Sequence, residues 1–397
     1  MRKLFAAFII ISLCFAGTGY SAPAKNTGKK ASPARQAKQP KQADVPYKAF
    51  IVVEAEGGKM IDGENIHERR APASITKLMV AYVVMDRLAT GAIKLTDKVT
   101  ASKNASQIGG SQVYLKEGET FTLEELMKAM LVASGNDAAY AISEYVAGSK
   151  DEMIKLMNAQ AKTLGLNDTE FHTVHGLPPS KGEKEDQTSC ADLAILAREL
   201  LKNPKIVEWT SIQTDTFRDG KFGLTNTNKL LGKFPGTDGL KTGYYSQTGF
   251  NVVATAKRGD MRFIVVVMGS PSGKARDTAT MEKLQKAFAQ YKMIGIVKKG
   301  EVIEQDVFLV DGKYRKMKGV TEKSFLYPMD VGKKGAITKE IVLPERVSGE
   351  IKEGQKLGEL VVKLDNSVIG KVNIVSPVYV PKANLFTRLI RRLGLNI

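Results

Sequence analysis

The segment 71–79, APASITKLM, places a serine and a lysine where they could act together on a carbonyl group. Ser74 precedes Lys77 by three residues, so in a helix the two side chains lie on one face, one turn apart. A serine becomes a nucleophile when a neighbouring base takes its proton, and a lysine can be that base if its pKa is lowered. A helix-capping serine followed by a surface lysine has the same spacing. The pair by itself therefore leaves both interpretations open.

Two further polar motifs follow at predicted junctions between elements. Ser134-Gly135-Asn136 falls between two predicted helices, and Lys241-Thr242-Gly243 opens a predicted strand. Lys241 would bring a second positive charge near Lys77, and a like charge together with partial burial favours the neutral form of a lysine. Gly243 would leave room for a substrate backbone at the strand edge. Each motif alone also fits an ordinary cap or turn, but the ordered set predicts a serine acyl-transfer site.

A buried helix must hold the first motif. The residues after Lys77 are apolar on nearly all sides, which predicts a helix over 74–88 inside the core. Pro72 suits entry into this helix and Gly91 suits its end. Ser74 would then lie at the end of this rigid helix that reaches the protein surface.

The N-terminal residues predict an exported protein. Two basic residues precede an apolar run that ends at Ala16, which is shorter than the roughly 20 residues of a membrane-spanning helix. We therefore interpret 1–24 as a signal peptide and the Lys-, Pro- and Gln-rich stretch 25–45 as a disordered linker. Cys190 would be the only cysteine left after cleavage, so no internal disulfide is expected.

The remaining chain predicts two domains. Strands, then helices, then strands again over 46–295 indicate an α+β domain, in which 250–257 and 261–268 form a hairpin. Short strands separated by Gly- and Lys-containing turns over 296–381 predict a small all-β domain.

The C-terminal tail, 382–397, is basic and amphipathic. Its leucines, with a phenylalanine and an isoleucine, lie on one side of a helix, and its arginines lie on the other. This pattern is typical of a segment in a membrane interface, although a terminal helix docked on the protein's own core would share it. The tail would attach the protein peripherally to the outer, periplasmic face of the cytoplasmic membrane.

The net charge of +17 is concentrated at the two ends of the chain. The body from 46 to 380 is only mildly basic. Such a distribution argues against nucleic-acid binding, which needs a basic patch on a folded domain. It fits contact with an anionic membrane surface or envelope polymer.

The three motifs, Ser74-x-x-Lys77, Ser134-x-Asn136 and Lys241-Thr242-Gly243, resemble those of penicillin-recognising serine enzymes. The stretches APASITKLM, LVASGNDAAYA, FHTVHGL and DGLKTGYYSQTGFNVVATA are similar to the D-alanyl-D-alanine carboxypeptidases among the low-molecular-mass penicillin-binding proteins. This resemblance implies a β-lactamase/transpeptidase-like α+β domain: an antiparallel sheet with helices on both faces and a helical subdomain. The family's layout of catalytic domain, stalk and membrane anchor matches the all-β domain and tail.

The resemblance also implies roles in the chemistry. Ser74 would be the acylated nucleophile and Lys77 its base. Ser134 and Asn136 would relay protons and hold the substrate's peptide backbone. No cofactor or metal is implied.

Substrate-binding roles follow in the same way. Lys241 and Thr242 would bind the terminal carboxylate of the substrate, and the N–H groups of Ser74 and Tyr244 would form the oxyanion hole. Arg262, in the strand after the Lys-Thr-Gly strand, would assist with the carboxylate.

The chain departs from the family pattern beside the predicted site. His175-Gly176-Leu177 matches a family loop for which a structural role is expected. Two prolines and the charged insertion 181–186 follow this loop, and Cys190 replaces the usual alanine. Both departures would act on substrate access and not on the chemistry.

The resemblance implies a carboxypeptidase that trims D-alanine from peptidoglycan stem pentapeptides and is acylated by β-lactam antibiotics. A β-lactamase is the alternative, but the corresponding loop has no Glu-x-x-x-Asn and carries only Glu183 and Glu185 in a charged run. A non-enzymatic envelope-binding module is a third interpretation, with the basic linker and tail as its active parts.

Overall fold

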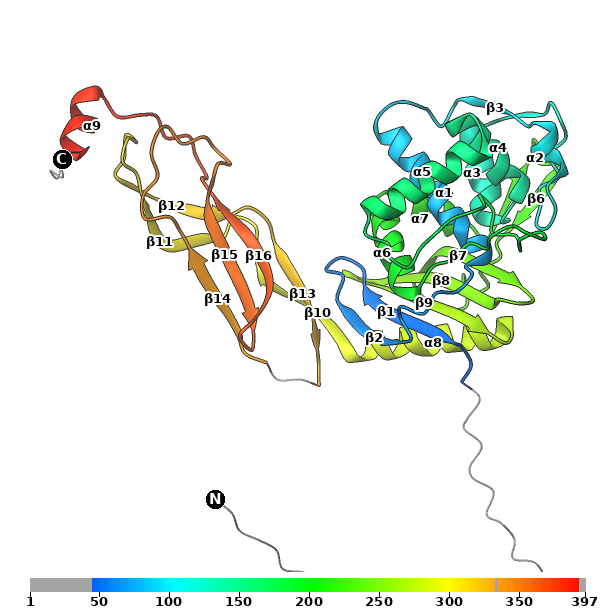
Figure 1. The fold of residues 1–397 in the computed structure, drawn as a ribbon. Helices are drawn as coiled ribbons and strands as arrows, with labels where there is room; N and C mark the ends of the chain where they lie inside the picture. The colour runs from blue at the N-terminus through cyan, green and yellow to red at the C-terminus, as the bar shows by residue number, and fades with distance from the viewer. Residues whose placement is uncertain (1–44, 333–334, 393–397) are drawn as a thin grey trace, which may run out of the picture. The chain divides into compact units, whose positions relative to one another are not determined.

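The computed structural model describes residues 45–332 and 335–392. The predicted signal peptide, the predicted linker up to Asp44 and the last five residues of the tail lie outside the described residues. The described chain forms an α+β domain followed by an all-β domain (Figure 1). The predicted fold class is confirmed.

The α+β domain is built on a five-stranded antiparallel sheet. Its strand order is β2-β1-β9-β8-β7. The N-terminal strand therefore pairs with β9, which lies more than 200 residues later in the chain. The predicted hairpin is confirmed as β8 and β9. The edge strand, β7, carries the Lys-Thr-Gly motif. The bounds are β1 (Ala49–Glu54), β2 (Met60–Glu64), β7 (Thr237–Tyr245), β8 (Gly249–Arg258) and β9 (Met261–Ser270).

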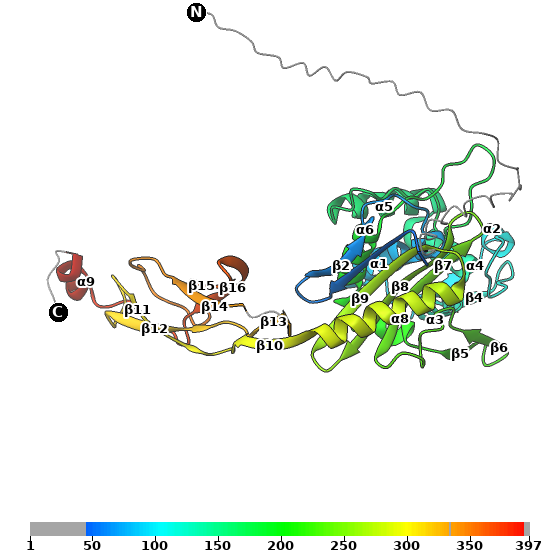
Figure 2. The same ribbon diagram turned by 90° about the horizontal axis from the view of Figure 1, so that it is seen from below.

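The two faces of this sheet bury different sets of side chains. Side chains alternate between faces along a strand, so Phe50 and Val52 pack with Leu284 of α8 (Gly273–Gln290). Ile51, between them, packs on the opposite face with the larger helical block. Figure 2 shows α8 running along one face of the sheet. Helices thus cover both faces, as expected.

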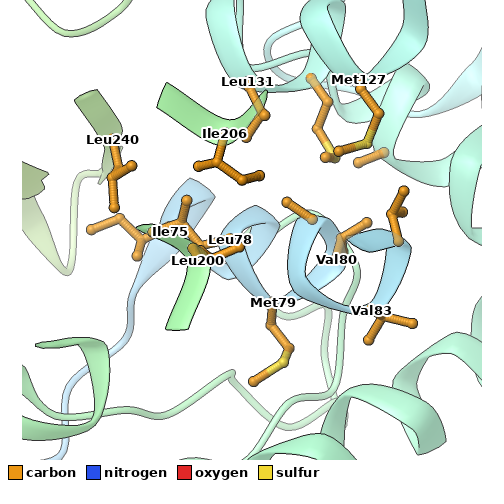
Figure 3. Packing of buried hydrophobic residues seen from close by; sticks show 14 of the residues in the cluster. Ile75, Leu78, Met79, Val80, Val83, Met127, Leu131, Leu200, Ile206 and Leu240 are labelled. Carbon is orange, nitrogen blue, oxygen red and sulfur yellow. The ribbon is translucent and has the colours of Figure 1, made fainter. Parts of the chain in front are cut away.

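The helical block surrounds one central apolar helix, α1. Figure 3 shows Leu78, Met79, Val80 and Val83 of α1 among side chains of neighbouring elements, and all four are buried. The elements of the block are η1 (Ala73–Thr76), α1 (Lys77–Ala89), α2 (Lys103–Gln107), α3 (Leu123–Val132), α4 (Asn136–Ala147), α5 (Lys150–Thr163), α6 (Cys190–Leu201) and α7 (Pro204–Thr210), with the short strands β3 (Lys98–Thr100), β4 (Thr120–Thr122), β5 (Thr214–Phe217) and β6 (Phe222–Thr225).

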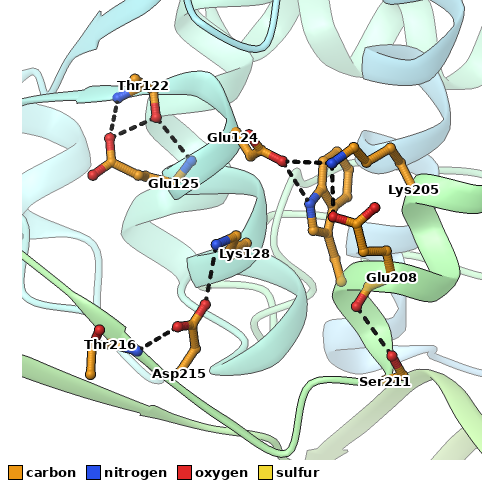
Figure 4. A network of polar contacts seen from close by, with 10 residues as sticks. Thr122, Glu124, Glu125, Lys128, Lys205, Glu208, Ser211, Asp215 and Thr216 are labelled. Carbon is orange, nitrogen blue, oxygen red and sulfur yellow. Dashed lines mark hydrogen bonds and ion pairs between the residues drawn. The ribbon is translucent and has the colours of Figure 1, made fainter. Parts of the chain in front are cut away.

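Polar contacts fix α3, which leads into the Ser-Gly-Asn turn. Thr122 and Glu125 form a capping box at its start, with the Glu125 carboxylate accepting from the Thr122 N–H at 2.7 Å. Glu124 accepts hydrogen bonds from Lys205 Nζ at 3.1 Å and Trp209 Nε1 at 3.3 Å (Figure 4). These contacts tie α3 to α7.

The all-β domain has its own core. A two-stranded pair, β10 (Tyr291–Val297) and β13 (Phe325–Asp330), accompanies a five-stranded sheet of order β11-β12-β16-β15-β14. Buried Ile303, Leu360 and Ile374 belong to this core. The strands of the larger sheet are β11 (Val302–Phe308), β12 (Lys316–Thr321), β14 (Ile337–Val342), β15 (Lys356–Leu364) and β16 (Ser367–Val375).

The predicted tail helix is present as α9 (Leu385–Arg392). Leu385, Phe386 and Leu389 are between 59% and 75% exposed, so these side chains are not docked on the protein's own core. Among the described residues, no helix has the length and apolarity needed to cross a bilayer.

Replacing Met79 with alanine tests the packing around α1. Met79 is 0% exposed and Met60 on β2 is 54% exposed, which makes Met60→Ala a matched control. We expect Met79→Ala to lower the free energy of unfolding by about 2–5 kcal/mol because it opens a cavity, and Met60→Ala to change it by less than about 0.5 kcal/mol. The chain's single tryptophan, Trp209, is buried in this domain, so its fluorescence during urea denaturation measures the effect. Equal destabilisation by both variants would contradict the described packing.

Candidate active site

The structure brings Ser74 and Lys77 into direct contact. Lys77 Nζ lies 2.9 Å from Ser74 Oγ and donates to the backbone oxygen of His175 at 2.8 Å. The predicted helix over 74–88 is wrong at its start, because the chain first forms the 3-10 turn η1 and α1 begins only at Lys77. Neither η1 nor α1 has a side-chain cap, and Lys77 is 0% exposed. The interpretation as a capping serine and a surface lysine is therefore excluded.

The surroundings of Lys77 favour its neutral form. Burial, and next the positive charge of Lys241, hold the pKa of Lys77 well below its ordinary value. The carboxylates Asp137 and Asp186 act in the opposite direction and do not outweigh these causes. A neutral amine has a lone pair that can accept a proton, and the Ser74 hydroxyl is within hydrogen-bond distance of it. The pair can thus act as base and nucleophile.

Two glycines enclose the backbone of the nucleophile. A Cβ on Gly176 would collide with the carbonyl group of Ala73 and come within 2.9 Å of Ser74 N. A Cβ on Gly243 would collide with the carbonyl oxygen of Pro72 and come within 3.1 Å of Ser74 N. The expectation that Gly243 leaves room for substrate is therefore corrected, because the close approach is that of the protein's own η1 turn.

The turn before Ser74 is held by Asn251 of β8 and by Thr248, the residue that precedes β8. Asn251 donates through Nδ2 to the carbonyl oxygen of Ala71 at 3.0 Å, and the Thr248 hydroxyl donates to the same oxygen at 2.6 Å. These contacts matter because Ala73 has φ +52°, a left-handed conformation that is costly for a residue with a Cβ. Ser134, in the second motif, has φ +63°. Strained backbone thus occurs at both turns of the site.

Asp186 is a buried anchor between two segments of the site. Its carboxylate accepts hydrogen bonds from the Thr76 hydroxyl at 2.7 Å, from the Thr173 hydroxyl at 2.7 Å and from the backbone N–H of His172 at 2.7 Å. It therefore joins η1 to the loop that supplies the His175 carbonyl. The prediction that 181–186 acts only on substrate access is wrong for this residue.

The imidazole of His175 is a structural group. Burial, with the charges of Lys77 and Lys150, lowers the pKa of His175 to about 3, so the ring is neutral at physiological pH. Its Nδ1 accepts from the N–H of Leu177 at 3.1 Å. Cys190 is also structural, since it is fully buried in the main core.

Asn136 presents an unused acceptor. Its Nδ2 donates to the backbone oxygen of Gly109 at 2.7 Å, while its Oδ1 is buried without a hydrogen-bond partner in the described part of the chain. A buried unpaired acceptor calls for a specific explanation. The adjacent Asp137 holds the facing loop by accepting from Val113 N at 3.1 Å and Leu115 N at 3.0 Å. The loop and Asn136 are thereby fixed together.

The Lys-Thr-Gly strand is linked to the Ser-Gly-Asn turn through Thr227. The Thr242 hydroxyl donates to Thr227 Oγ1 at 2.8 Å, and the Thr227 N–H donates to the backbone oxygen of Val132, at the end of α3, at 3.3 Å. The third motif is therefore beside the second. No sequence signal marks Thr227.

Arg276, on α8, has an electrostatic effect on Lys241 that the sequence did not reveal. Burial, and next the charge of Arg276, lower the pKa of Lys241 to about 7. Arg276 is itself buried and pairs with Asp277 at 2.7 Å. Lys241 therefore has a second cation in its vicinity, and Asp277 balances part of that charge; we call Lys241 and Arg276 the positive region.

Arg262 does not belong to this region, and its predicted role is wrong. Its guanidinium binds both carboxylate oxygens of Asp238, at 2.8 and 2.7 Å. In the sheet it is opposite Lys257, whereas Lys241 is opposite Val253. Arg262 lies on β9, which β8 separates from β7, and it is also displaced from Lys241 by four residues along β8, so it does not reach the Lys-Thr-Gly strand.

Tyr244 lies at the exposed side of β7. Its ring is stacked on Phe250 with 4.0 Å between ring centres. The close approach of Gly243 to Ser74 N places the backbone next to Tyr244 beside the nucleophile. The predicted oxyanion hole from Ser74 and Tyr244 stays a prediction.

A pocket of about 600 Å³ borders the site at His175 and Leu177. Its lining combines the aromatic ring of Tyr140 with the basic side chains of Lys150 and Lys184. It offers space beside the His175 loop for a larger part of a peptide.

Two protein families match consecutive segments of the chain. The family described as D-alanyl-D-alanine carboxypeptidase matches residues 35–272. The family described as Penicillin-binding protein 5, C-terminal domain, matches residues 291–382. The resemblance expected from the three motifs is confirmed.

Full-length relatives agree with these matches. The chain is 36% identical over 404 residues to the D-alanyl-D-alanine carboxypeptidase DacF of Bacillus subtilis, covering 99% of this chain and 98% of that protein. It is 32% identical over 355 residues to DacC of Escherichia coli, with 87% of each chain covered.

Solved structures show the same similarity. PBP3 of Streptococcus pneumoniae has a TM-score of 0.76 at 28% identity, covering 85% of this chain and 99% of that chain. Penicillin-binding protein D2 of Listeria monocytogenes, in its ampicillin-bound form, has a TM-score of 0.55 at 30% identity, covering 60% and 97%.

The pH dependence of acylation by benzylpenicillin tests the electrostatics of Lys241. A protonated Lys241 attracts the carboxylate of the drug, so the second-order acylation rate should fall as pH rises through about 7. Removing the charge of Arg276 raises the pKa of Lys241, so Arg276→Gln should move this falling limb to higher pH, whatever its effect on the maximum rate. Arg87→Gln, in the last turn of α1, is the control and should leave the limb in place. An unmoved limb in Arg276→Gln would refute the coupling.

Proposed function

Because the chain belongs to the D-alanyl-D-alanine carboxypeptidase family, we propose that it removes the terminal D-alanine from peptidoglycan stem pentapeptides through an acyl-enzyme on Ser74. The observation that carries this proposal is the buried Lys77 amine, 2.9 Å from Ser74 Oγ and beside the charge of Lys241. Burial lowers the pKa of Lys77 so that its amine can act as a base, and the positive charge of Lys241 lies beside it.

Acylation starts with proton transfer from Ser74 to Lys77. The oxygen of Ser74 then attacks the carbonyl carbon of the penultimate D-alanine, and a tetrahedral intermediate forms. The N–H groups of Ser74 and Tyr244 stabilise its oxyanion. Collapse of the intermediate breaks the peptide bond, and Lys77 returns the proton, through Ser134, to the leaving amine of D-alanine.

The positive region selects the end of the peptide. Lys241, Thr242 and Arg276 bind the terminal carboxylate, which only the last residue of a stem peptide carries. The negative charge of this carboxylate raises the pKa of Lys241 and keeps the lysine protonated in the complex. Recognition of a free carboxylate explains cleavage one residue from the end.

The unpaired oxygen of Asn136 orients the rest of the substrate. A substrate amide N–H can donate to the buried Oδ1, which has no partner among the described residues. The peptide would then be held on both sides of the scissile bond. Water finally hydrolyses the ester on Ser74 and releases the shortened stem peptide.

β-Lactams fit the same site as inhibitors, because they combine a reactive carbonyl group with a carboxylate. The β-lactamase alternative is not favoured. Asp186 and Asp137 accept hydrogen bonds from the protein itself, as described above, and Glu185 binds the Tyr245 hydroxyl and Gln187. In the described part of the chain, no carboxylate contacts Ser74, so fast deacylation has no dedicated base.

Ser74→Ala tests the proposed chemistry. This variant should lose D-alanine release from purified pentapeptide muropeptides and lose covalent labelling by a fluorescent penicillin, because both need the Ser74 oxygen. Ser211→Ala, at the end of α7, is a matched control and should retain both activities. Mass spectrometry of the muropeptides and gel fluorescence give the two readouts. Labelling that survives Ser74→Ala would refute the assignment, and undiminished muropeptide binding without turnover by the native chain would favour an envelope-binding module.

The sequence at both ends of the chain supports export of the protein and its attachment to the outer face of the cytoplasmic membrane. A signal peptide over 1–24 would export the chain, and α9 would hold it peripherally at the outer face of the cytoplasmic membrane. The exposed Leu385, Phe386 and Leu389 supply an apolar side, and the arginines of the tail suit anionic headgroups.

Acidic substitutions in α9 test this attachment. Leu385→Asp with Phe386→Asp should reduce the bound fraction in vesicle sedimentation at least several-fold, since two apolar groups become charged. Turnover of a soluble pentapeptide should not change. Thr387→Ser is the control and should bind like the native chain. Full vesicle binding by the double variant would exclude α9 as the anchor.

A further inference from the structure

The end of the all-β domain next to α9 is formed by three segments that are distant in sequence, 308–315, 345–351 and 378–382. β-Bridges join Leu309 to Val347, Gly312 to Lys382 and Ile351 to Val380. The N–H of Lys313 also donates to the carbonyl oxygen of Pro381 at 2.8 Å. The loop after β11 therefore lies directly beside the segment that leads into α9.

Large apolar side chains are exposed at this end. They are between 52% and 56% exposed, and they lie together on these adjoining segments, whereas Val302 and Val368 are equally exposed elsewhere in the domain. Single exposed apolar residues are ordinary, but a group of them on adjoining segments marks an interaction surface. We call this group the tail-end surface, and it consists of Phe308, Tyr314, Val378 and Tyr379.

Basic residues surround these side chains. Lys313, Arg346 and Lys382 are exposed on the same three segments. The exposed acids there are Glu345 and Glu350, and Glu350 accepts a hydrogen bond from the Tyr379 hydroxyl at 3.4 Å. The tail adds three arginines and no acid. The combined end of the molecule is therefore positively charged.

This composition fits a lipid interface. Tyrosine rings are amphipathic and are enriched at the headgroup level of membranes. Lysine and arginine side chains near them are attracted by anionic lipids. The chain runs from this surface directly into α9, so both can meet the same bilayer.

We propose that the tail-end surface inserts into the interface of an anionic phospholipid bilayer alongside α9. The inference rests on the proposed membrane attachment of the tail and adds a second, folded contact to it. The all-β domain then stands on the membrane through its own residues, and α9 is not its sole contact. Two contacts separated along the chain restrict the tilt of the domain in a way that one terminal helix does not.

A tryptophan quenching experiment tests this contact directly. Val378 and Val368 are matched, since they are 52% and 54% exposed. Val368 lies at the start of β16 and Val378 lies three residues after its end, so they are about 20 Å apart or more at the rise of an extended strand. In vesicles of phosphatidylglycerol and phosphatidylethanolamine with doxyl-labelled lipid, Val378→Trp should add fluorescence that is quenched. Val368→Trp should add fluorescence that is not. If neither is quenched in a chain that sediments with the vesicles, α9 binds alone and the proposal fails.

Removing the aromatic rings gives the second measurement. The triple variant Phe308→Ser, Tyr314→Ser and Tyr379→Ser should bind these vesicles several-fold more weakly while turning over soluble pentapeptide normally. Val302→Ser with Val368→Ser is the surface control and should bind normally. If the triple variant binds fully but the acidic α9 variant does not, the tail is the sole anchor and this inference is wrong. If the α9 variant binds fully and the triple variant does not, the tail-end surface is the anchor and the proposed role of α9 is wrong.

Discussion

The active site depends on keeping one lysine out of water. Lys77 begins the buried helix α1, and its amine has the Ser74 hydroxyl and the His175 carbonyl oxygen as partners. Two carboxylates in the vicinity would favour a charged lysine, but burial and the charge of Lys241 have the larger effect. A less apolar helix, or a looser His175 loop, would admit water and restore an ordinary, protonated lysine.

The same environment acts on two lysines that need opposite charge states. Burial lowers the pKa of both Lys77 and Lys241, and each lies near another cation. Lys77 must be neutral to take a proton, while Lys241 must be protonated to hold a carboxylate. The substrate resolves this conflict, because its carboxylate reaches Lys241 and stabilises the charge there. Lys241 is therefore fully protonated, and able to hold a carboxylate, only when the substrate is bound.

Backbone geometry makes the electrostatics usable. The peptide before Ser74 is enclosed by Gly176 and Gly243 and is held from β8 by Asn251. Asp186 connects this turn to the His175 loop. Since the restraints come from β7, from β8 and from the loop that contains Gly176 and Asp186, a shift of any of these three moves the nucleophile relative to its base. The strained conformation of Ala73 is maintained by these restraints.

The sequence by itself determined the elements and the residues that carry the chemistry. Apolar periodicity, turn residues and the spacing of Ser74, Lys77, Asn136 and Lys241 are local properties, so they are readable along the chain. Only the tertiary structure determined which distant residues act on these catalytic and binding residues. Arg276 reaches Lys241 only because α8 packs on the sheet, and Arg262, though nearer in sequence, is displaced along its strand and bound by Asp238. Strand register and helix packing determine which distant residues become neighbours. Neither can be predicted from the spacing of residues along one chain.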